Sequence, residues 1–336
     1  MPAPHRHANL LDVLIIGAGP AGLAAAIAAR ERGLSSVVLE KGALVHSLLH
    51  YPSAMVFFTT PELMEIGGLP FVSPHEKPTR LEALRYYRRV TDHFALDVRL
   101  GERVTTLAGE AGGGFRVTSV RDGREEPPGD RRARFVVIAS GAYDVPNRIG
   151  VPGEDLRHVS HYYQDAHCHY RQRVVIVGGK NSAAEAALEI HRAGGQALIV
   201  HRGAALGESI KYWVKPDIEN RIKEGSIQAR FGTRVTAITP TEVLLDGPDG
   251  AVREPADAVL LLTGYRSDPT LLRQAGADLD ATTGAPIHAE ATYETTVPGL
   301  FVIGAAIAGS QSGRIFIENG RFHGGVVIAE IARRLG

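Results

Sequence analysis

Short runs of apolar residues alternate with longer amphipathic or alanine-rich stretches along this 336-residue chain. The apolar runs are typical of buried strands. In sequence order they are Leu11–Ile16, Ser36–Leu39, Phe135–Ala139, Val174–Val177, Ala197–Val200, Ala258–Leu262 and Phe301–Ile303. Strands that alternate with helices predict parallel sheets covered by helices on both faces.

Helical spacing is clearest at Thr79–Phe94. One face of that helix carries Leu81, Leu84, Tyr87 and Val90. A last helix is expected from about Glu318 to Leu335. Between Gly101 and Arg134, β-type runs separated by clusters of glycine and proline predict a small antiparallel excursion.

Two breaks that contain proline and glycine, at residues 144–153 and 263–269, divide this pattern. We therefore expect an α/β protein with two Rossmann-like three-layer dinucleotide-binding domains, the second inserted into the first. The expected boundaries are residues 1–147 and 265–336 for the first domain and residues 148–264 for the second.

A glycine-rich segment, residues 17–22, lies between the first strand and an alanine-rich helix. Gly17 permits the tight turn, Gly19 lets the backbone approach a pyrophosphate, and Gly22 lets helix and strand pack closely. The pyrophosphate is held by free N–H groups and by the positive end of the helix dipole. Glu40 ends the next strand, where a carboxylate accepts hydrogen bonds from an adenosine ribose. A glycine turn without a ligand is the alternative.

Residues 178–183 form a second glycine-rich segment of this kind, but Lys180 stands where the middle glycine is expected. We call residues 17–22 the first cradle and residues 178–183 the second cradle. A side chain there crowds a pyrophosphate unless it pairs with phosphate, and we favour that pairing over a site that binds nucleotide poorly. The next strand ends in His201 and Arg202 instead of an acid. Because arginine grips a 2′-phosphate through a bidentate fork, we expect NADPH over NADH. An ordinary surface role for Arg202 stays open.

Two dinucleotides in one enzyme indicate hydride transfer between a flavin and a nicotinamide. The predicted FAD-binding residues are Gly17, Gly19, Pro20, Ala21, Gly22, Glu40, Lys41, Ser140, Gly141, Gly304 and Ala305. The predicted NADPH-binding residues are Gly178, Gly179, Lys180, Asn181, Ser182, Ala183, His201 and Arg202.

Composition narrows the partners of the protein. The chain has 37 basic and 37 acidic residues, so its totals do not favour nucleic acid or an anionic membrane. No apolar stretch approaches the ~20 residues that span a bilayer. Residues 1–9 are polar and carry no export signal, which predicts a cytoplasmic protein. A single cysteine, Cys168, excludes an internal disulfide and a cysteine-based zinc site.

At this point the chain resembles the thioredoxin-reductase-like flavoproteins, and within them the YpdA-type bacillithiol disulfide reductases. The resemblance covers essentially the whole length. It is carried by Glu40–Gly42, Tyr51–Pro52, Phe57–Phe58, Glu65–Gly67, Gly178–Ala183, Ile210–Asn220 and Ile315–His323. It implies FAD in the outer domain, NADPH in the inserted domain and a homodimer, and the family also has a lysine at the position of Lys180.

Three departures limit that resemblance. Thioredoxin reductases carry a Cys-x-x-Cys motif where this chain has His161–Gln164, so reduction of thioredoxin through a dithiol is not expected. The bacillithiol-linked enzymes carry a single cysteine where this chain has Ala21, which removes the thiolate proposed to exchange with the disulfide. Relatives often place aspartate where this chain has Ala305, so the contact to the ribitol must come from backbone.

Cys168 is the one candidate catalytic residue that the sequence offers. His167 and His169 flank it and could activate the thiol, but a connector without chemistry is the competing interpretation. Adjacent ligands do not converge easily on one centre, so no metal site is expected.

We predict an NADPH-dependent flavoprotein oxidoreductase whose acceptor is a low-molecular-weight disulfide such as bacillithiol disulfide. The alternatives are a ferredoxin, flavodoxin or quinone reductase without a thiol step, and a non-catalytic flavin or NADPH sensor.

Overall fold

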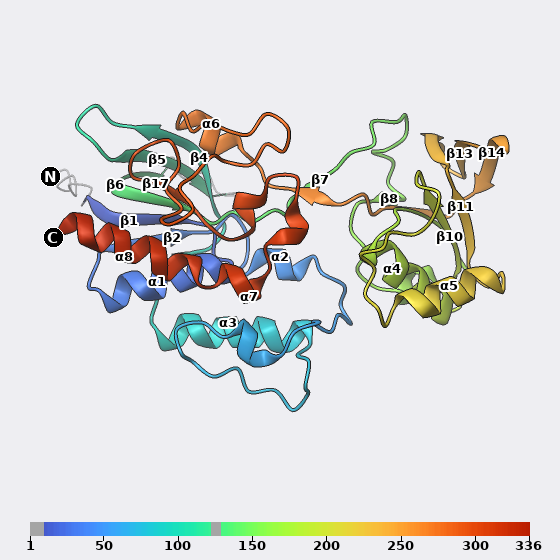
Figure 1. Cartoon of the computed structure of the whole chain (residues 1–336), viewed down its shortest axis with the longest axis horizontal. Helices are drawn as coiled ribbons and strands as arrows, with labels where there is room; N and C mark the ends of the chain where they lie inside the picture. Colours follow the sequence, from blue (N-terminus) through green and yellow to red (C-terminus); the bar gives the residue numbers. More distant parts are fainter. Residues whose placement is uncertain (1–9, 122–128) are drawn as a thin grey trace, which may run out of the picture. The chain divides into compact units, whose positions relative to one another are not determined.

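The computed structural model describes residues 10–121 and 129–336, so the predictions for residues 1–9 and for Pro127 and Pro128 of the predicted antiparallel excursion lie outside the described residues. The chain divides into two compact units (Figure 1). The first comprises the described residues up to Leu49, Met55–Val145 and Tyr265–Gly336. The second comprises His50–Ala54 and Pro146–Gly264. Each unit is described by itself below.

The first unit contains a mixed sheet with helices. Its strands are β1 (Leu11–Ile16), β2 (Ser36–Leu39), β3 (Val98–Arg99), β4 (Glu102–Gly109), β5 (Phe115–Arg121), β6 (Gly129–Ile138) and β17 (Leu300–Val302). Its α-helices are α1 (Pro20–Glu31), α2 (His46–Leu49), α3 (Arg80–His93), α6 (Thr270–Gln274), α7 (Ile317–Gly320) and α8 (His323–Leu335). Its 3-10 helices are η1 (Pro61–Met64), η3 (Gly304–Ala308) and η4 (Ser312–Arg314).

The second unit repeats the α/β pattern. Its strands are β8 (Val159–Ser160), β9 (Arg173–Val177), β10 (Gln196–His201), β11 (Gln228–Phe231), β12 (Arg234–Ile238), β13 (Glu242–Gly247), β14 (Gly250–Pro255) and β15 (Ala258–Leu261). Its helices are η2 (His167–His169), α4 (Asn181–Arg192) and α5 (Lys215–Lys223). The two short strands β7 (Val145–Pro146) and β16 (Tyr265–Arg266) pair with each other where the chain passes between the units.

Strand β6 joins two kinds of sheet in the first unit. Its second half pairs in parallel with β1 and β17, and β1 pairs in parallel with β2. Its first half pairs antiparallel with β5, which continues to β4. The antiparallel excursion predicted from glycine and proline spacing is therefore present in the structure, and β6 extends from it into the parallel core.

Alternate residues of the parallel strands face opposite sides of the sheet, so both sides need a cover. Leu14, Val136 and Val302 pack in one cluster with Phe115 and Val117 of the excursion. On the helical side, α8 packs along α1 (Figure 1). A Cβ added at Gly324 would lie 2.5 Å from the backbone nitrogen of Ala25, so only glycine allows this approach.

Helix α3 confirms the predicted helix but corrects its buried face. Thr79 and Glu82 form a capping box at its start, which accounts for where the helix begins. Leu81, which the helical spacing places on the same face as Tyr87 and Val90, is 50% exposed, whereas those two residues are buried. Tyr86 is buried instead, because its hydroxyl accepts a hydrogen bond from the Ile66 N–H at 2.9 Å and donates to the Leu69 carbonyl at 2.8 Å.

The prediction of one continuous helix from about Glu318 to Leu335 is wrong. The structure has two helices, α7 and α8, with Arg321 and Phe322 between them. The break follows Gly320, where an added Cβ would lie 3.4 Å from the Cα of Gly304. The chain turns here so that α7 can pass close to Gly304 while α8 lies along α1.

The second unit has a parallel sheet in the order β11-β10-β9-β15-β8 and a three-stranded antiparallel sheet β12-β13-β14. Ile176 and Leu260 face the cluster that contains the apolar residues of α4 and α5. Val175 and Leu261 face Val243 of the antiparallel sheet. Because both faces of the parallel sheet are apolar, it is covered by helices on one face and by the antiparallel sheet on the other, which gives three layers.

A buried acid stabilises the antiparallel excursion of the first unit. Glu102 is 3% exposed, accepts a hydrogen bond from the Ser119 hydroxyl at 2.5 Å and forms an ion pair with Arg131. Burial alone would raise the pKa of Glu102, but the hydrogen bonds from Ser119 and Arg131 outweigh it and lower the pKa below its usual value of 4.5.

We expect Glu102→Gln to reduce the free energy of unfolding at pH 7. Breaking a fully buried pair costs about 3–5 kcal/mol, and we expect about 2 kcal/mol because Arg131 is partly exposed. Because folding lowers the pKa of Glu102, the advantage of the natural chain is present above pH 4.5 and disappears as the pH falls through the folded pKa. Urea denaturation at pH 7 and at pH 3 measures this.

Glu110→Gln is the matched control for this prediction. Glu110 pairs with Arg132 on the same excursion, but the side chain of Arg132 is 57% exposed. An exposed pair contributes about 0.5 kcal/mol. Equal losses in the two variants at pH 7 would contradict the role assigned to Glu102.

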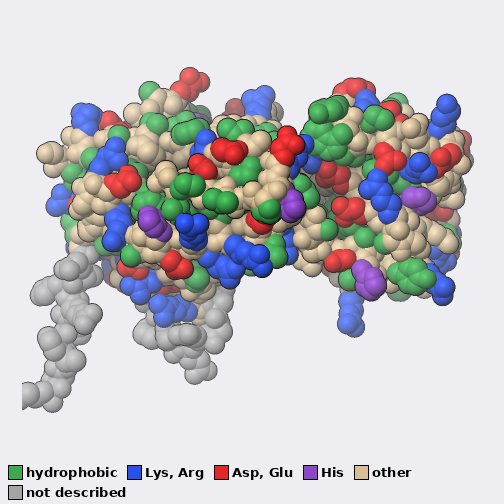
Figure 2. All heavy atoms as spheres, turned by 90° about the horizontal axis from the view of Figure 1, so that it is seen from below, with side chains coloured by type: hydrophobic (Ala, Val, Ile, Leu, Met, Phe, Trp, Pro, Cys, Tyr) green, Lys and Arg blue, Asp and Glu red, His purple; other side chains and the backbone are tan. Residues whose placement is uncertain are grey.

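The surface of the protein carries charges of both signs. Figure 2 shows basic and acidic side chains interspersed on the face that it presents, in keeping with the zero formal net charge. Within residues 10–121 and 129–336, the structure contains no helix long and apolar enough to cross a membrane.

Candidate functional site: two glycine-rich cradles

The first cradle follows β1 and opens α1. Gly17 has a φ of +107°, and a Cβ there would lie 2.5 Å from the Ala139 carbonyl oxygen. A Cβ at Gly22 would lie 2.0 Å from the Gly17 carbonyl oxygen. Both positions therefore need glycine for the turn itself and for the packing of the helix on the strand, as the sequence predicts.

Gly19 differs from these two glycines. Its backbone is extended, with φ −76° and ψ 176°, and a Cβ built there meets no atom within 4 Å. The protein has no steric need for glycine at this position. The open space lies outside the start of α1, where a diphosphate would approach the backbone.

The N-terminus of α1 has donors to offer such a ligand. Pro20 is the first residue of the helix, Gly19 provides no side-chain cap, and the first turn contains no acid. The first N–H groups of a helix have no partner within the helix. Together with the space at Gly19, these donors and the positive end of the helix dipole fit a dinucleotide diphosphate.

Glu40 has a closer relation to the cradle than the sequence indicates. Its side chain accepts hydrogen bonds from the N–H of Ala18 and the N–H of Gly42, each at 2.9 Å. Glu40 is buried, and its two hydrogen bonds hold the backbone of the first cradle in place. Each carboxylate oxygen keeps a second lone pair that can accept a hydrogen bond from a ribose hydroxyl group. Lys41 forms an ion pair with Asp144 at 2.8 Å.

The other predicted FAD-binding residues lie at the same edge of the sheet. Ser140 and Gly141 follow β6, and Gly304 and Ala305 follow β17. Gly304 has a φ of +63°, and a Cβ there would lie 2.9 Å from the Cβ of Ala21. The structure thus brings the turn at Gly304 directly against the start of α1. Ligands of open α/β sheets bind outside these carboxyl ends of strands.

The second cradle follows β9 and opens α4. A Cβ at Gly178 would lie 2.7 Å from the Leu262 carbonyl oxygen, which explains the glycine at the strand-to-helix turn. Lys180 is extended and exposed, and it does not cap α4 with its side chain. Ser182 is also exposed, and Ala183 is buried against the core. The pairing of Lys180 with a phosphate stays a prediction.

Two predicted NADPH-binding residues have partners inside the second unit. The Asn181 side chain accepts a hydrogen bond from the Lys211 N–H at 2.8 Å and donates to the Ser209 carbonyl at 3.2 Å. The ring of His201 lies over Gly179, where a Cβ would come within 2.5 Å of it. Burial, and then the charge of Arg202, lowers the pKa of His201. These side chains support the cradle from within.

Arg202 is exposed at the end of β10, directly after His201. The described part of the chain offers it no ion-pair partner, so its guanidinium group faces solvent. In dinucleotide-binding units the adenosine ribose lies beside the end of this second strand. Arg202 is therefore positioned for a 2′-phosphate.

Cys168 lies exposed in η2. Nearby, the Tyr163 hydroxyl donates a hydrogen bond to Glu189 at 2.5 Å, and burial followed by this carboxylate raises the pKa of Tyr163. The hydrogen bond between Tyr163 and Glu189 does not involve the thiol of Cys168. In the described ranges the structure brings together no group of three or more histidine, cysteine, aspartate or glutamate side chains suited to a metal ion.

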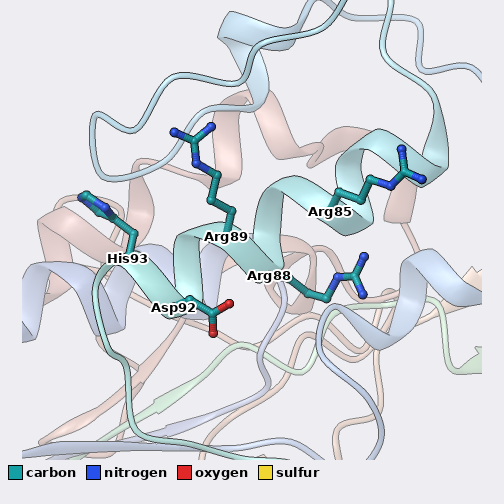
Figure 3. Close-up of a pocket in the computed structure, with 5 residues that line it drawn as sticks. All are labelled: Arg85, Arg88, Arg89, Asp92 and His93. Atoms are coloured by element: carbon teal, nitrogen blue, oxygen red, sulfur yellow. The ribbon is translucent and has the colours of Figure 1, made fainter.

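A cavity of about 640 Å³ lies beside α3, and none of the residues that line it belongs to either cradle. Five residues line it, namely Arg85, Arg88, Arg89, Asp92 and His93 (Figure 3). Figure 3 shows Arg85 and Arg89 pointing to one side of the helix and Arg88 and Asp92 to another. These side chains do not converge on one point, so the cavity is not a candidate site for hydride chemistry.

Comparison with known proteins agrees with the geometry of the cradles. A family model described as pyridine nucleotide-disulphide oxidoreductase matches residues 14–304. The chain belongs to this family. It is a pyridine nucleotide-disulphide oxidoreductase that uses FAD and NADPH, and the predictions of the enzyme class and of both cofactors are confirmed.

Several known oxidoreductases are similar over nearly the whole chain. Bacilliredoxin reductase Bdr of Bacillus subtilis (strain 168) is 39% identical over 322 residues, which cover 96% of this chain and 97% of that protein. The structure of bacillithiol disulfide reductase Bdr (YpdA) from Bacillus cereus matches with a TM-score of 0.93 at 37% identity, covering 97% of this chain and 100% of that one.

A ferredoxin–NADP reductase of Thermus thermophilus is 29% identical over 320 residues, covering 88% of this chain and 85% of that protein. The resemblance to the YpdA-type reductases and the two-domain Rossmann-like fold, both expected from the sequence, are confirmed by the similarities to the two Bdr proteins.

Proposed function

We propose that this oxidoreductase reduces a low-molecular-weight disulfide of the bacillithiol disulfide type with electrons from NADPH. The observation that carries the proposal is the first cradle, which has open space at Gly19 and is contacted by the turn at Gly304. The 39% identity of the chain to bacilliredoxin reductase Bdr supports it. In the overall reaction one NADPH and one proton convert one disulfide into two thiols and NADP⁺. Bound FAD would supply the two-electron chemistry that links NADPH to the acceptor.

Each cofactor is assigned to one unit. FAD binds the first unit, residues 1–147 and 265–336 in the predicted boundaries, at the helix start, Glu40 and the turn at Gly304. NADPH binds the second unit, residues 148–264, with the diphosphate at the start of α4. There Lys180 neutralises phosphate charge and Arg202 holds the 2′-phosphate.

The chain contains only one thiol group that could take part in disulfide exchange. Cys168 is its single cysteine, and it is exposed on a 3-10 helix of the second unit. Ala21 stands in the cradle, where it contacts the turn at Gly304. This favours a second candidate function, namely reduction of a carrier protein or quinone without a thiol step, and the similarity to ferredoxin–NADP reductases supports it.

Stopped-flow spectroscopy of the FAD-loaded protein under anaerobic conditions tests both candidates. NADPH should bleach the flavin absorbance, and bacillithiol disulfide should then restore it and release two thiols. Reoxidation by ferredoxin, flavodoxin or a quinone, with none by disulfides, would select the second candidate. A protein that binds no FAD would overturn both.

We expect Cys168→Ser to leave disulfide reduction within about twofold of the natural chain, because an exposed thiol without an activating base is a poor nucleophile at neutral pH. Ala21→Cys is the complementary variant, since it places a thiol beside Gly304 in the cradle. Turnover measured with NADPH and bacillithiol disulfide distinguishes them. A loss above tenfold in Cys168→Ser would assign that thiol to the reaction.

Two finer properties belong to the same proposal. We expect a homodimer, as the resemblance to thioredoxin-reductase-like flavoproteins implies, and a cytoplasmic location, which a single cysteine fits. Light scattering after size-exclusion chromatography measures the mass in solution. A mass near 36 kDa, that of one chain, would contradict the dimer.

A further inference from the structure

His323 lies outside every residue set predicted to bind a cofactor, yet it contacts one of them. It is the first residue of α8 and is 6% exposed. Its Nδ1 atom accepts a hydrogen bond from the N–H of Gly304 at 3.2 Å. Gly304 is the residue of the β17 turn that lies against Ala21 of the first cradle.

This hydrogen bond defines the chemical state of the ring. A backbone N–H only donates, so the Nδ1 atom of His323 must be unprotonated and the hydrogen of the neutral ring lies on Nε2. Burial lowers the pKa of His323, and the neighbouring His288 lowers it further. The environment therefore keeps the ring in the neutral form that can accept from Gly304.

The ring of His323 is held in place from two sides. Gly324, the next residue, packs against the backbone of Ala25 in α1, so the start of α8 is pressed onto the cradle helix. The ring of Tyr293 stacks on His323 with centroids 4.2 Å apart and an angle of 17°. These contacts leave the imidazole one orientation toward Gly304.

Tyr293 adopts a backbone conformation that side-chain-bearing residues rarely use. Its φ is +59°, in the left-handed region. Its N–H donates to the Ala289 carbonyl at 2.8 Å, and its carbonyl accepts from the Val302 N–H at 3.0 Å. Strained backbone of this kind collects at functional sites, and here it presents the tyrosine ring to His323.

The turn that His323 fixes has a specific task in the proposed FAD site. This chain has Ala305 in place of an acid after Gly304, so any contact from this turn to the ribitol chain comes from backbone groups. A backbone donor or acceptor binds well only when its peptide plane is fixed beforehand. The N–H of Gly304 is bound to His323, which fixes the peptide plane between Ile303 and Gly304 at the start of the turn to Ala305.

We propose that His323 is a positioning residue for FAD, which as a neutral hydrogen-bond acceptor fixes the Ile303–Gly304 peptide, and with it the start of the turn to Ala305, against the first cradle. The inference rests on the proposed FAD site. It assigns to the start of α8 a role that neither the glycine pattern nor the family match indicates.

Two variants separate the hydrogen bond from the packing of the ring. His323→Asn keeps an acceptor near the position of Nδ1 and loses the stacked ring, whereas His323→Phe keeps the ring and loses the acceptor. The measurements are the dissociation constant of FAD for the refilled apoprotein, the visible circular dichroism of the bound flavin, and the unfolding midpoint of the apoprotein.

We expect FAD affinity to fall about tenfold or more in His323→Phe, because the Gly304 N–H is left buried without a partner, and to stay within about threefold in His323→Asn. The circular dichroism should change in His323→Phe alone. The reverse order, or equal affinities in all three proteins, would overturn the role of the acceptor. If the natural chain binds no FAD, the FAD site itself is wrong.

A measurement on the natural chain completes the test should a variant not fold. Nitrogen-15 NMR of histidine-labelled, FAD-loaded protein reports which ring nitrogen carries hydrogen. An unprotonated Nδ1 in His323 supports the proposal, and a hydrogen on Nδ1 overturns it.

Discussion

Gly19→Ala is expected to abolish tight FAD binding while leaving the apoprotein folded. The backbone of Gly19 is extended, and its Cβ position is open, so the alanine side chain costs the fold little. In the proposed complex, the diphosphate approaches the N-terminus of α1 through that space. Losing charge-assisted hydrogen bonds of about 1.5–3 kcal/mol each predicts a fall in FAD affinity of about 100-fold.

Fluorescence titration of the apoprotein with FAD, together with urea denaturation, measures the two effects of Gly19→Ala separately. Gly22→Ala is the matched control on the same cradle. Its Cβ would lie 2.0 Å from the Gly17 carbonyl oxygen, so this variant should lose about 3 kcal/mol of folding free energy before any ligand is added. Unchanged FAD affinity in a folded Gly19→Ala protein would remove the diphosphate from this cradle.

Arg202→Ala should raise the KM for NADPH about 30-fold and leave kcat and the KM for NADH nearly unchanged. A bidentate contact to a 2′-phosphate is a charge-assisted interaction of about 2 kcal/mol, and NADH lacks that group. Because the 2′-phosphate is remote from the reacting carbon, its loss weakens binding without slowing hydride transfer. Steady-state kinetics of flavin reduction with both nucleotides measures the two constants.

Arg253→Ala is the control for Arg202→Ala. Arg253 is also exposed and belongs to the second unit, but it pairs with Glu242 on the antiparallel sheet at 3.5 Å. Its removal should change neither KM by more than about twofold, as for other exposed pairs. A preference for NADPH that survives Arg202→Ala would move the 2′-phosphate to another residue.

The cradles could be predicted because their physics is local. A strand, a turn through Gly17 and a helix that starts beside it are contiguous, so the steric need for glycine appears as a motif in the sequence. The apolar strands were equally readable, since burial on both faces of a parallel sheet requires continuous apolar runs. The burial of Tyr86 could not be predicted in this way, because its hydroxyl binds backbone groups of Ile66 and Leu69 in a segment without periodicity.

Contacts between distant segments could not be predicted from the sequence either, because their partners lie far apart along the chain. Glu40 was expected to face a ribose, but only the folded chain shows that it also binds the N–H groups of Ala18 and Gly42. Asn181 was expected to face NADPH, and the structure shows its amide bound to Lys211 and Ser209. Neither partner can be identified from spacing along the chain.

The amino-acid sequence by itself determined two glycine-rich cradles, the insertion of one domain into the other and the presence of a single cysteine, because these follow from neighbouring residues or from composition. Only the tertiary structure decided which carboxylate and amide groups hold the cradles together, and where the last helix breaks. It alone placed His323 on Gly304, since that contact needs α8, β17 and α1 to be packed together. Hydrogen bonds and steric limits between such segments exist only after the chain has folded.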